Sequence, residues 1–164
     1  MPAIGDAAPD FDLSSTEDAV LMLRDEVART SVIVYFFTDP ADARAHRDLD
    51  ALQQRLDRLA RRRARVLAVS PAKLGDLKKL QAERRLGFPL LHDDRDFSAA
   101  YGVEPGAPAL AVVSRKQRLL WLANPVASVA EALAPVEKVL AAEPSPTGSY
   151  PKSVINRLID RLVN

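Results

Sequence analysis

The side chains best placed for chemistry stand where a buried strand is predicted to lead into a helix, just after the apolar run from Ser31 to Phe37. They are two carboxylates, a guanidinium, an imidazole, a phenol and a hydroxyl: Asp42, Asp48, Arg44, His46, Tyr35 and Thr38. A strand that feeds a helix places helix-start N–H groups at the end of a sheet, where α/β proteins commonly carry their sites. This set predicts a small polar pocket for an anion or a protein partner.

A simpler interpretation of these residues is a solvated first helical turn in which Asp42 supports the cap and the helix dipole, and this is the one we favour. His46 as a general base needs an oriented partner and a pocket, and the sequence indicates neither. His92 beside Asp93 and Asp94 is a weak metal trio, and an ordinary surface turn is favoured there. We therefore expect no metal and no cofactor.

The composition restricts the chemistry further. The chain has 164 residues, no cysteine, two histidines and a formal net charge of +1. The lack of cysteine excludes disulfides, thiolate metal sites and every thiol mechanism that uses this chain's own residues. The balanced charge gives no global attraction to nucleic acid or to a membrane surface. No apolar run approaches the ~20 residues of a membrane span and no signal-peptide pattern is present, so we expect a cytoplasmic protein.

The helices and strands that position these residues are predicted from the periodicity of apolar residues and from residues that start or stop helices. Helices are predicted over 24–28, 40–63, 72–86, 97–101 and 128–141, and strands over 31–37, 66–69, 88–91, 109–113 and 119–122. Asp39-Pro40 is expected to start the long helix and Gly87 to stop the next one. An N-terminal hairpin is predicted around an edge strand at Phe11 and Leu13.

The order of these elements predicts an α/β fold. The early β-α-β units need parallel pairing, and the short link at 114–117 makes the last two strands antiparallel. The result is a mixed central sheet flanked by helices, a thioredoxin-like architecture with an N-terminal β-hairpin and an appended C-terminal helix.

Composition divides the chain into a domain over 1–143, a linker over 144–151 and an amphipathic helix over 152–164. The apolar stripe of that helix is Val154, Ile155, Leu158, Ile159 and Leu162. An isolated helix of this length is marginal in water, so it is expected to dock on its own domain, the arrangement favoured by the sequence, or on a neighbouring copy, which would give a homodimer.

Arginines gather near the end of the long predicted helix, between Arg55 and Arg65. The full set is Arg55, Arg58, Arg61, Arg62, Arg63 and Arg65. Nucleic-acid contact is one interpretation. A solvated helix face is favoured, because aspartates are interleaved and few aromatic residues accompany the cluster.

Several segments over residues 3–141 resemble, in order, the peroxiredoxins of the AhpC/TSA family, and the Q-type (bacterioferritin-comigratory) branch above all. They are 5–13 (GDAAPDFDL), 34–37 (VYFF), 66–71 (VLAVSP), 88–91 (FPLL) with Asp93, and 99–103 (AAYGV). The resemblance implies a thioredoxin-like fold and an antioxidant, thiol-peroxidase activity.

This chain departs from the family's P-x-x-x-T-x-x-C motif at each functional position. Thr38 stands for the proline, Asp42 for the threonine and Ala45 for the reactive cysteine. The family's arginine falls near Pro108, and we expect a cis peptide bond between Ala107 and Pro108 there.

We therefore expect no catalytic residue, only a residual pocket from Tyr35, Thr38, Asp42, Arg44, His46 and Pro108. Asp39-Pro40 is expected to close that pocket as a first helical turn. The predicted role is binding or assembly with an unidentified protein partner or as a homodimer. The alternative, a peroxidase-type oxidoreductase, requires a nucleophile from another protein.

Overall fold

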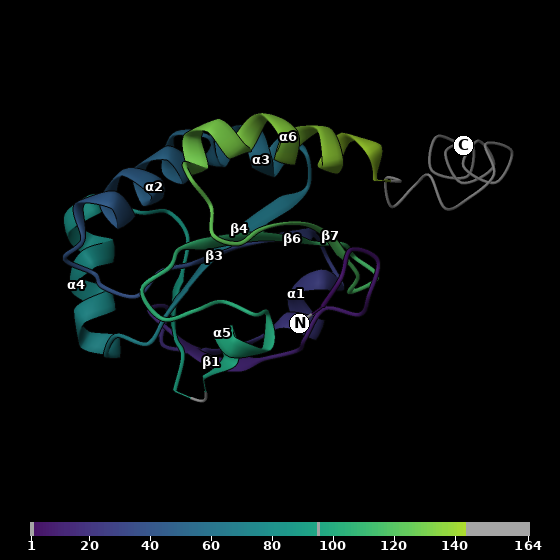
Figure 1. Cartoon of the computed structure of the whole chain (residues 1–164). Coiled ribbons are helices and arrows are strands. Elements are labelled where there is room, and N and C mark those ends of the chain that lie inside the picture. The colour runs from purple at the N-terminus through teal and green to yellow at the C-terminus, as the bar shows by residue number, and fades with distance from the viewer. Residues whose placement is uncertain (1, 95, 144–164) are drawn as a thin grey trace, which may run out of the picture.

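The computed structural model describes residues 2–94 and 96–143 (Figure 1). In the described part, the strands are β1 (Asp12–Ser15), β2 (Val20–Met22), β3 (Ser31–Phe36), β4 (Ala64–Ser70), β5 (Leu90–His92), β6 (Ala109–Val113) and β7 (Leu119–Ala123). The helices are α1 (Leu23–Val27), α2 (Ala43–Gln54), α3 (Leu56–Arg61), α4 (Leu74–Arg84), α5 (Phe97–Ala100) and α6 (Val129–Ala142).

The strands form one sheet in the order β2-β1-β5-β4-β3-β6-β7. β3, β4 and β5 run parallel to one another, β6 pairs antiparallel with β3, and β7 pairs antiparallel with β6. The expected α/β fold, with a mixed central sheet and an N-terminal β-hairpin, is thus confirmed.

β3 lies inside the sheet between β4 and β6, and every one of its residues is buried. Its side chains alternate, so Ile33 and Tyr35 face one apolar cluster while Val32, Val34 and Phe36 face the other. Branched and aromatic side chains suit a strand that is covered on both faces. β3 therefore holds both layers of the molecule together and ends at the candidate site.

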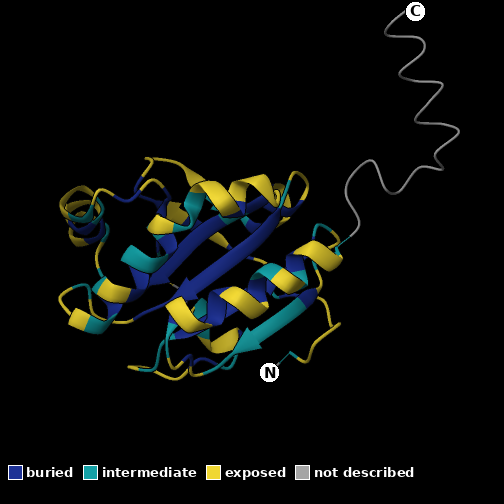
Figure 2. Cartoon of the chain, turned by 90° about the horizontal axis from the view of Figure 1, so that it is seen from above, coloured by how far each residue is buried: buried dark blue, intermediate teal, exposed yellow. Residues whose placement is uncertain are grey.

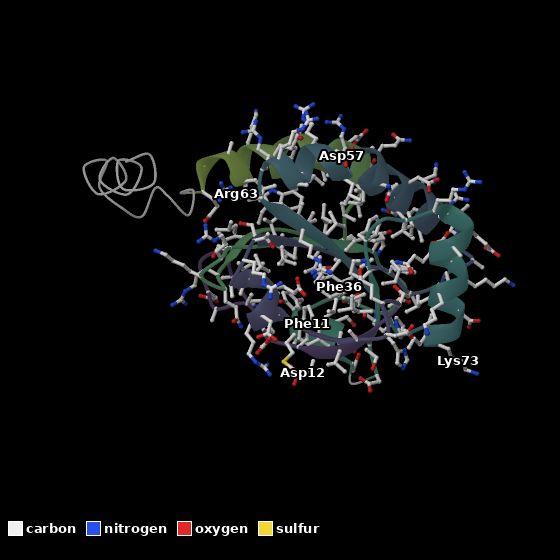
Figure 3. The ribbon with its side chains drawn as sticks, turned by 180° about the vertical axis from the view of Figure 1, so that it is seen from behind. Phe11, Asp12, Phe36, Asp57, Arg63 and Lys73 are labelled. Atoms are coloured by element: carbon white, nitrogen blue, oxygen red, sulfur yellow. The ribbon has the colours of Figure 1, made fainter. Side chains whose placement is uncertain are left out.

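Helices cover the two faces unequally. α2, α3, α4 and α6 pack on the face of Tyr35, whereas the shorter α1 and α5 lie on the face of Phe36 (Figure 1). Seen from above, buried strands lie beneath helices whose outer surfaces are exposed (Figure 2). Figure 3 shows Phe11 and Phe36 on one side of the sheet and Asp57 of α3 on the other.

Two expectations for the long helix are wrong. It begins at Ala43, not beside Asp39, because Asp42 is the N-cap residue: it has extended backbone (φ −70°, ψ 125°) and its side chain accepts from the Arg44 N–H. The helix is also broken at Arg55, and α3 begins at the next residue, although neither proline nor glycine marks the break.

Three smaller expectations are corrected as well. β1 is not an edge strand, since it pairs with β2 on one side and β5 on the other. Helix α4 starts at Leu74, two residues later than expected. Its left-handed terminal residue is Arg85 (φ 53°) rather than Gly87, which instead donates its N–H to the Gln53 side chain.

The predicted linker over 144–151 and the predicted helix over 152–164 lie outside the described residues. None of the helices in the described ranges has the length and apolar character that crossing a membrane requires.

Candidate functional site

The carboxyl end of β3 opens onto a hollow of about 230 Å³. Its lining comes from three places in the sequence: the end of β3, the start of α2 and the loop before β6. The residues are Tyr35, Phe37, Thr38, Asp39, Asp42, Arg44, Ala45, Gly106 and Pro108. The structure therefore brings together five of the six residues of the expected pocket, together with Ala45, and leaves His46 out.

The start of α2 is built from two aspartates three residues apart. Asp39 accepts the Ala41 N–H with its side chain at 2.8 Å and the Asp42 N–H with its carbonyl at 3.1 Å, which forms a turn ahead of the helix. Asp42 then caps the helix through the Arg44 N–H at 3.1 Å. A separate turn followed by a capped helix replaces the closed helical turn that was expected, and the hollow stays open beside it.

Ala45 lies in the first turn of α2, where its methyl group is 3 % exposed. It belongs to the apolar cluster of Tyr35, Phe37 and Leu49. A methyl group has no nucleophilic, acid or base chemistry. The Asp42 carboxylate accepts one of the α2 N–H groups that would otherwise be available to a bound anion.

A buried phenol–carboxylate pair lies beneath the hollow. The Tyr35 hydroxyl donates to Asp48 at 2.7 Å, and the other Asp48 oxygen accepts the Val129 N–H, at the start of α6, at 3.3 Å. Tyr35 is fully buried and Asp48 is 5 % exposed. Burial, and after it the hydrogen bond to Asp48, raise the pKa of the Tyr35 phenol far above its ordinary value. Tyr35 therefore stays protonated as a donor and cannot act as a base near neutral pH.

Arg44 joins the site to the segment before α6. Its guanidinium donates to the Ala127 carbonyl at 2.9 Å and also to the Val126 carbonyl. The Val126 N–H in turn donates to the Pro108 carbonyl at 2.9 Å. The cation nearest to Ala45 in the sequence thus lines the hollow while its guanidinium donates to two backbone carbonyls.

Thr38 ties the end of β3 to the loop before β6. Its hydroxyl accepts the Gly106 N–H at 2.9 Å, and its carbonyl accepts from the Ser70 hydroxyl at 3.2 Å. The cis peptide bond of the described residues is Asn124–Pro125, so the expected cis bond before Pro108 is wrong. Pro108 nevertheless lines the hollow, opposite the start of α2.

The two histidines have structural partners. His46 Nε2 lies 2.6 Å from the Pro40 carbonyl, and His92 Nδ1 lies 2.7 Å from the Ala72 carbonyl. Asp93, next to His92, accepts the N–H groups of Phe97 and Ser98 and so starts α5. Across the described ranges, no three histidine, aspartate or glutamate side chains come close enough to hold a metal ion.

The arginine cluster divides into residues that form ion pairs and residues that are exposed. Arg55 and Arg58 lie 3.7 and 2.6 Å from the carboxylate of Glu137 on α6, and Arg65 lies 2.7 Å from Glu26. Arg61, Arg62 and Arg63 are exposed, and Arg63 stands near the end of α3 in Figure 3. Half of the cluster therefore serves ion pairs within the domain.

Sequence reasoning missed the remote members of the site. Gly106 and the carbonyls of residues 126 and 127 carry no chemical signature and reach α2 only through the fold. Asp48 did carry a signal, because an acid beside Leu49 and Leu52 on the buried stripe of a helix requires a partner. Taken together, these contacts use most of the site's polar groups to hold the chain in place.

A known family matches this chain in sequence, and known structures resemble it in fold. A model of the AhpC/TSA family matches residues 4–121. The crystal structure of peroxidoxin BcpB from Mycobacterium tuberculosis has a TM-score of 0.82 at 19% identity, with 88% of this chain and 100% of that chain covered. The bacterioferritin comigratory protein of Xanthomonas campestris, in a structure of its alkyl peroxide reduction complexes, gives 0.76 at 18% identity over 86% and 97% of the two chains.

A structure of a putative thiol:disulfide interchange protein, DsbE from Chlorobium tepidum, has a TM-score of 0.74 at 24% identity, with 85% of this chain and 99% of that one covered. Among curated proteins no sequence matches this chain. At such low identities the structural likenesses show the fold alone, and they confirm the expected thioredoxin-like, peroxiredoxin-type architecture.

Proposed function

Since this chain belongs to the AhpC/TSA family, we propose that it keeps the fold of that family for binding or assembly and does not itself reduce peroxides. The observation that carries this proposal is Ala45 at the position of the family's reactive cysteine, in a sequence without any cysteine. Cleavage of a peroxide by this family's chemistry needs a thiolate, and no residue of the chain can supply one.

The surroundings of Ala45 support the same conclusion. A thiolate at a helix start is stabilised by free N–H groups and by a nearby cation. Here Asp42 already caps α2, and Arg44 donates to two backbone carbonyls. The polar groups of the site hold β3, α2 and the start of α6 together, and this structural use supports a fold that is kept without the peroxidase chemistry.

The enzyme alternative is a peroxidase-type oxidoreductase that borrows its thiol from a partner protein. The hollow of about 230 Å³ beside Thr38 is the place such a partner would have to reach. We propose an unidentified protein partner and a location in the cytoplasm on the basis of the sequence alone. The exposed arginines at 61–63 leave nucleic-acid binding as a lesser alternative, which salt-sensitive retention on heparin would support.

A peroxide-consumption assay on the purified chain tests the proposal. With a thiol reductant and either hydrogen peroxide or an organic hydroperoxide, we expect the same rate of loss as with boiled protein. A thiol peroxidase run in parallel shows that the assay can detect turnover. Peroxide loss that scales with the amount of native chain would contradict the proposal.

A further inference from the structure

Two hollows flank α5 on the face of the sheet opposite α2. One, of about 300 Å³, has an apolar floor that includes Phe36, Val69 and Val103. The other, of about 370 Å³, lies over Phe11 and Phe97. Asp96 lines both hollows, and we call the pair the α5 groove.

The rim of the α5 groove is acidic. Asp94, Asp96 and Glu104 line it and make no ion pair within the described part of the chain, while Asp10 and Asp12 share Arg24. Arg95 lies outside the described residues, yet with its charge counted the groove still carries an excess of carboxylates. A groove with an apolar floor and an acidic rim suits an apolar segment that carries positive charge.

The sequence supplies such a segment. Residues 152–163 combine the apolar stripe of Val154, Ile155, Leu158, Ile159 and Leu162 with positive charge. Lys152, Arg157 and Arg161 stand against a single acid, Asp160. An amphipathic segment must bury its stripe to become ordered.

The rest of the described surface has few other apolar sites where this segment could dock. Its exposed large hydrophobic residues are Ile4 and Val20. A further hollow of about 320 Å³, between α3 and the start of β4, has an apolar wall at Leu56 and Phe88. Its charged lining residues are Glu17, Arg63 and Arg65, and Arg65 is paired with Glu17 and Glu26. This hollow therefore lacks the excess of carboxylates that attracts a positively charged segment to the α5 groove.

The length of the linker argues that the segment binds a neighbouring molecule. α6 starts beside Asp48, near the site end of the sheet, and its 14 residues carry the chain about 21 Å away from it. Residues 144–151 span at most about 29 Å when fully extended. To reach its own groove, the chain would have to return across this length and round the sheet to its other face.

We propose that residues 152–163 of one molecule dock in the α5 groove of a second copy, and that reciprocal exchange makes a twofold dimer. The inference gives a specific form to the assembly role proposed above. The two fail separately, because oligomeric state and peroxide turnover are measured independently.

The test is analytical ultracentrifugation of the full chain and of two charge-reversal variants. One reverses the groove (Asp94→Lys, Asp96→Lys and Glu104→Lys), and the other reverses the segment (Arg157→Glu and Arg161→Glu). We expect a dimer for the unmodified chain and a dimer dissociation constant raised about tenfold or more in either variant. Combining the two sets is expected to restore the dimer, because opposite charges then face each other again.

A matched reversal of exposed acids elsewhere, Asp57→Lys with Asp76→Lys and Glu83→Lys, controls for the change in net charge and is expected to leave the dimer intact. Circular dichroism checks that each variant is folded, and the segment variant changes no residue of the described domain. The inference is overturned if the unmodified chain is a monomer, or if the groove reversal leaves the dimer dissociation constant unchanged. It is also overturned by a combined variant that stays monomeric while folded.

Discussion

Ala45 and Asp42 face the same hollow from the first turn of α2. The Asp42 side chain accepts a hydrogen bond from the Arg44 N–H, and the Arg44 guanidinium donates to carbonyls of the segment before α6. A thiol placed at position 45 would therefore meet a carboxylate and would gain little from the cation. Replacing the missing cysteine alone does not recreate the conditions that activate it.

The substitution Ala45→Cys makes this testable. We expect a thiol with a pKa at or above the ordinary value of about 8.5, and no peroxide turnover above that of a free thiol. The pH dependence of its alkylation rate measures the pKa, with Ala60→Cys on the exposed side of α3 as the control. A thiol pKa depressed below about 7, with rapid peroxide turnover, would show that the site still activates a cysteine.

The two buried tyrosines donate hydrogen bonds to different acceptors, a charged one for Tyr35 and a neutral one for Tyr101. Tyr35 donates to the carboxylate of Asp48, and Tyr101 donates to the Pro9 carbonyl at 2.8 Å. Tyr35→Phe is expected to lower the free energy of unfolding by about 1.5–3 kcal/mol, against about 0.5–1.5 kcal/mol for Tyr101→Phe. Urea unfolding measures both, and an equal loss would mean that Asp48 does not depend on the phenol.

The elements around the site are joined by one face of α2. Arg44 and Asp48 lie one helical turn apart, and together they bind the backbone of residues 126, 127 and 129. Charge-assisted bonds to backbone groups are stronger than neutral ones. This face of α2 therefore sets where α6 begins.

Arg44→Gln is expected to loosen that junction. The amides of Val126 and Val129 should exchange with solvent at least about tenfold faster, corresponding to about 1.4 kcal/mol of local stability. Arg47→Gln, on the exposed side of α2, is the matched control and is expected to change neither amide. Unchanged exchange in both variants would remove Arg44 as the link between α2 and α6.

The sequence predicted the elements better than their ends. β3 was recognisable because a strand buried on both faces is a continuous apolar run. The start of α2 was misplaced because Asp39-Pro40 and Asp42 are both good start signals, and the choice between them depends on the loop packed opposite, at Gly106. The break at Arg55 was not predicted, because neither proline nor glycine marks it in the sequence.

The sequence predicted the contiguous residues of the site better than those that come from distant parts of the chain. Residues 35 to 45 are contiguous, so their types and spacing placed them together. Pro108 was found only through the family resemblance, and residues 126–129 were not found. A backbone carbonyl that binds Arg44 looks the same in the sequence as any other.

The whole molecule buries both tyrosines of its described part. Burial raises the pKa of each phenol far above its ordinary value, chiefly by desolvation. A raised pKa in the folded state means that the proton stabilises the fold below the unfolded value near 10, and that this stabilisation is lost as the pH rises above it.

Two of the three tyrosines are therefore expected to ionise only as the protein unfolds at alkaline pH. Tyrosinate absorbance and circular dichroism, followed in one titration, measure both events. If all three phenols ionised near pH 10 in folded protein, the buried positions of Tyr35 and Tyr101 would be contradicted.

We propose that this member of the AhpC/TSA family has kept the structural role of its β3–α2 junction and lost the chemical one. The most direct measurement is the initial rate of peroxide loss with purified chain, at increasing protein concentration and with excess thiol reductant. We expect a slope of zero, equal to that of Tyr35→Phe and of boiled protein. A positive slope with native chain, abolished by boiling, would show that the chain does reduce peroxides.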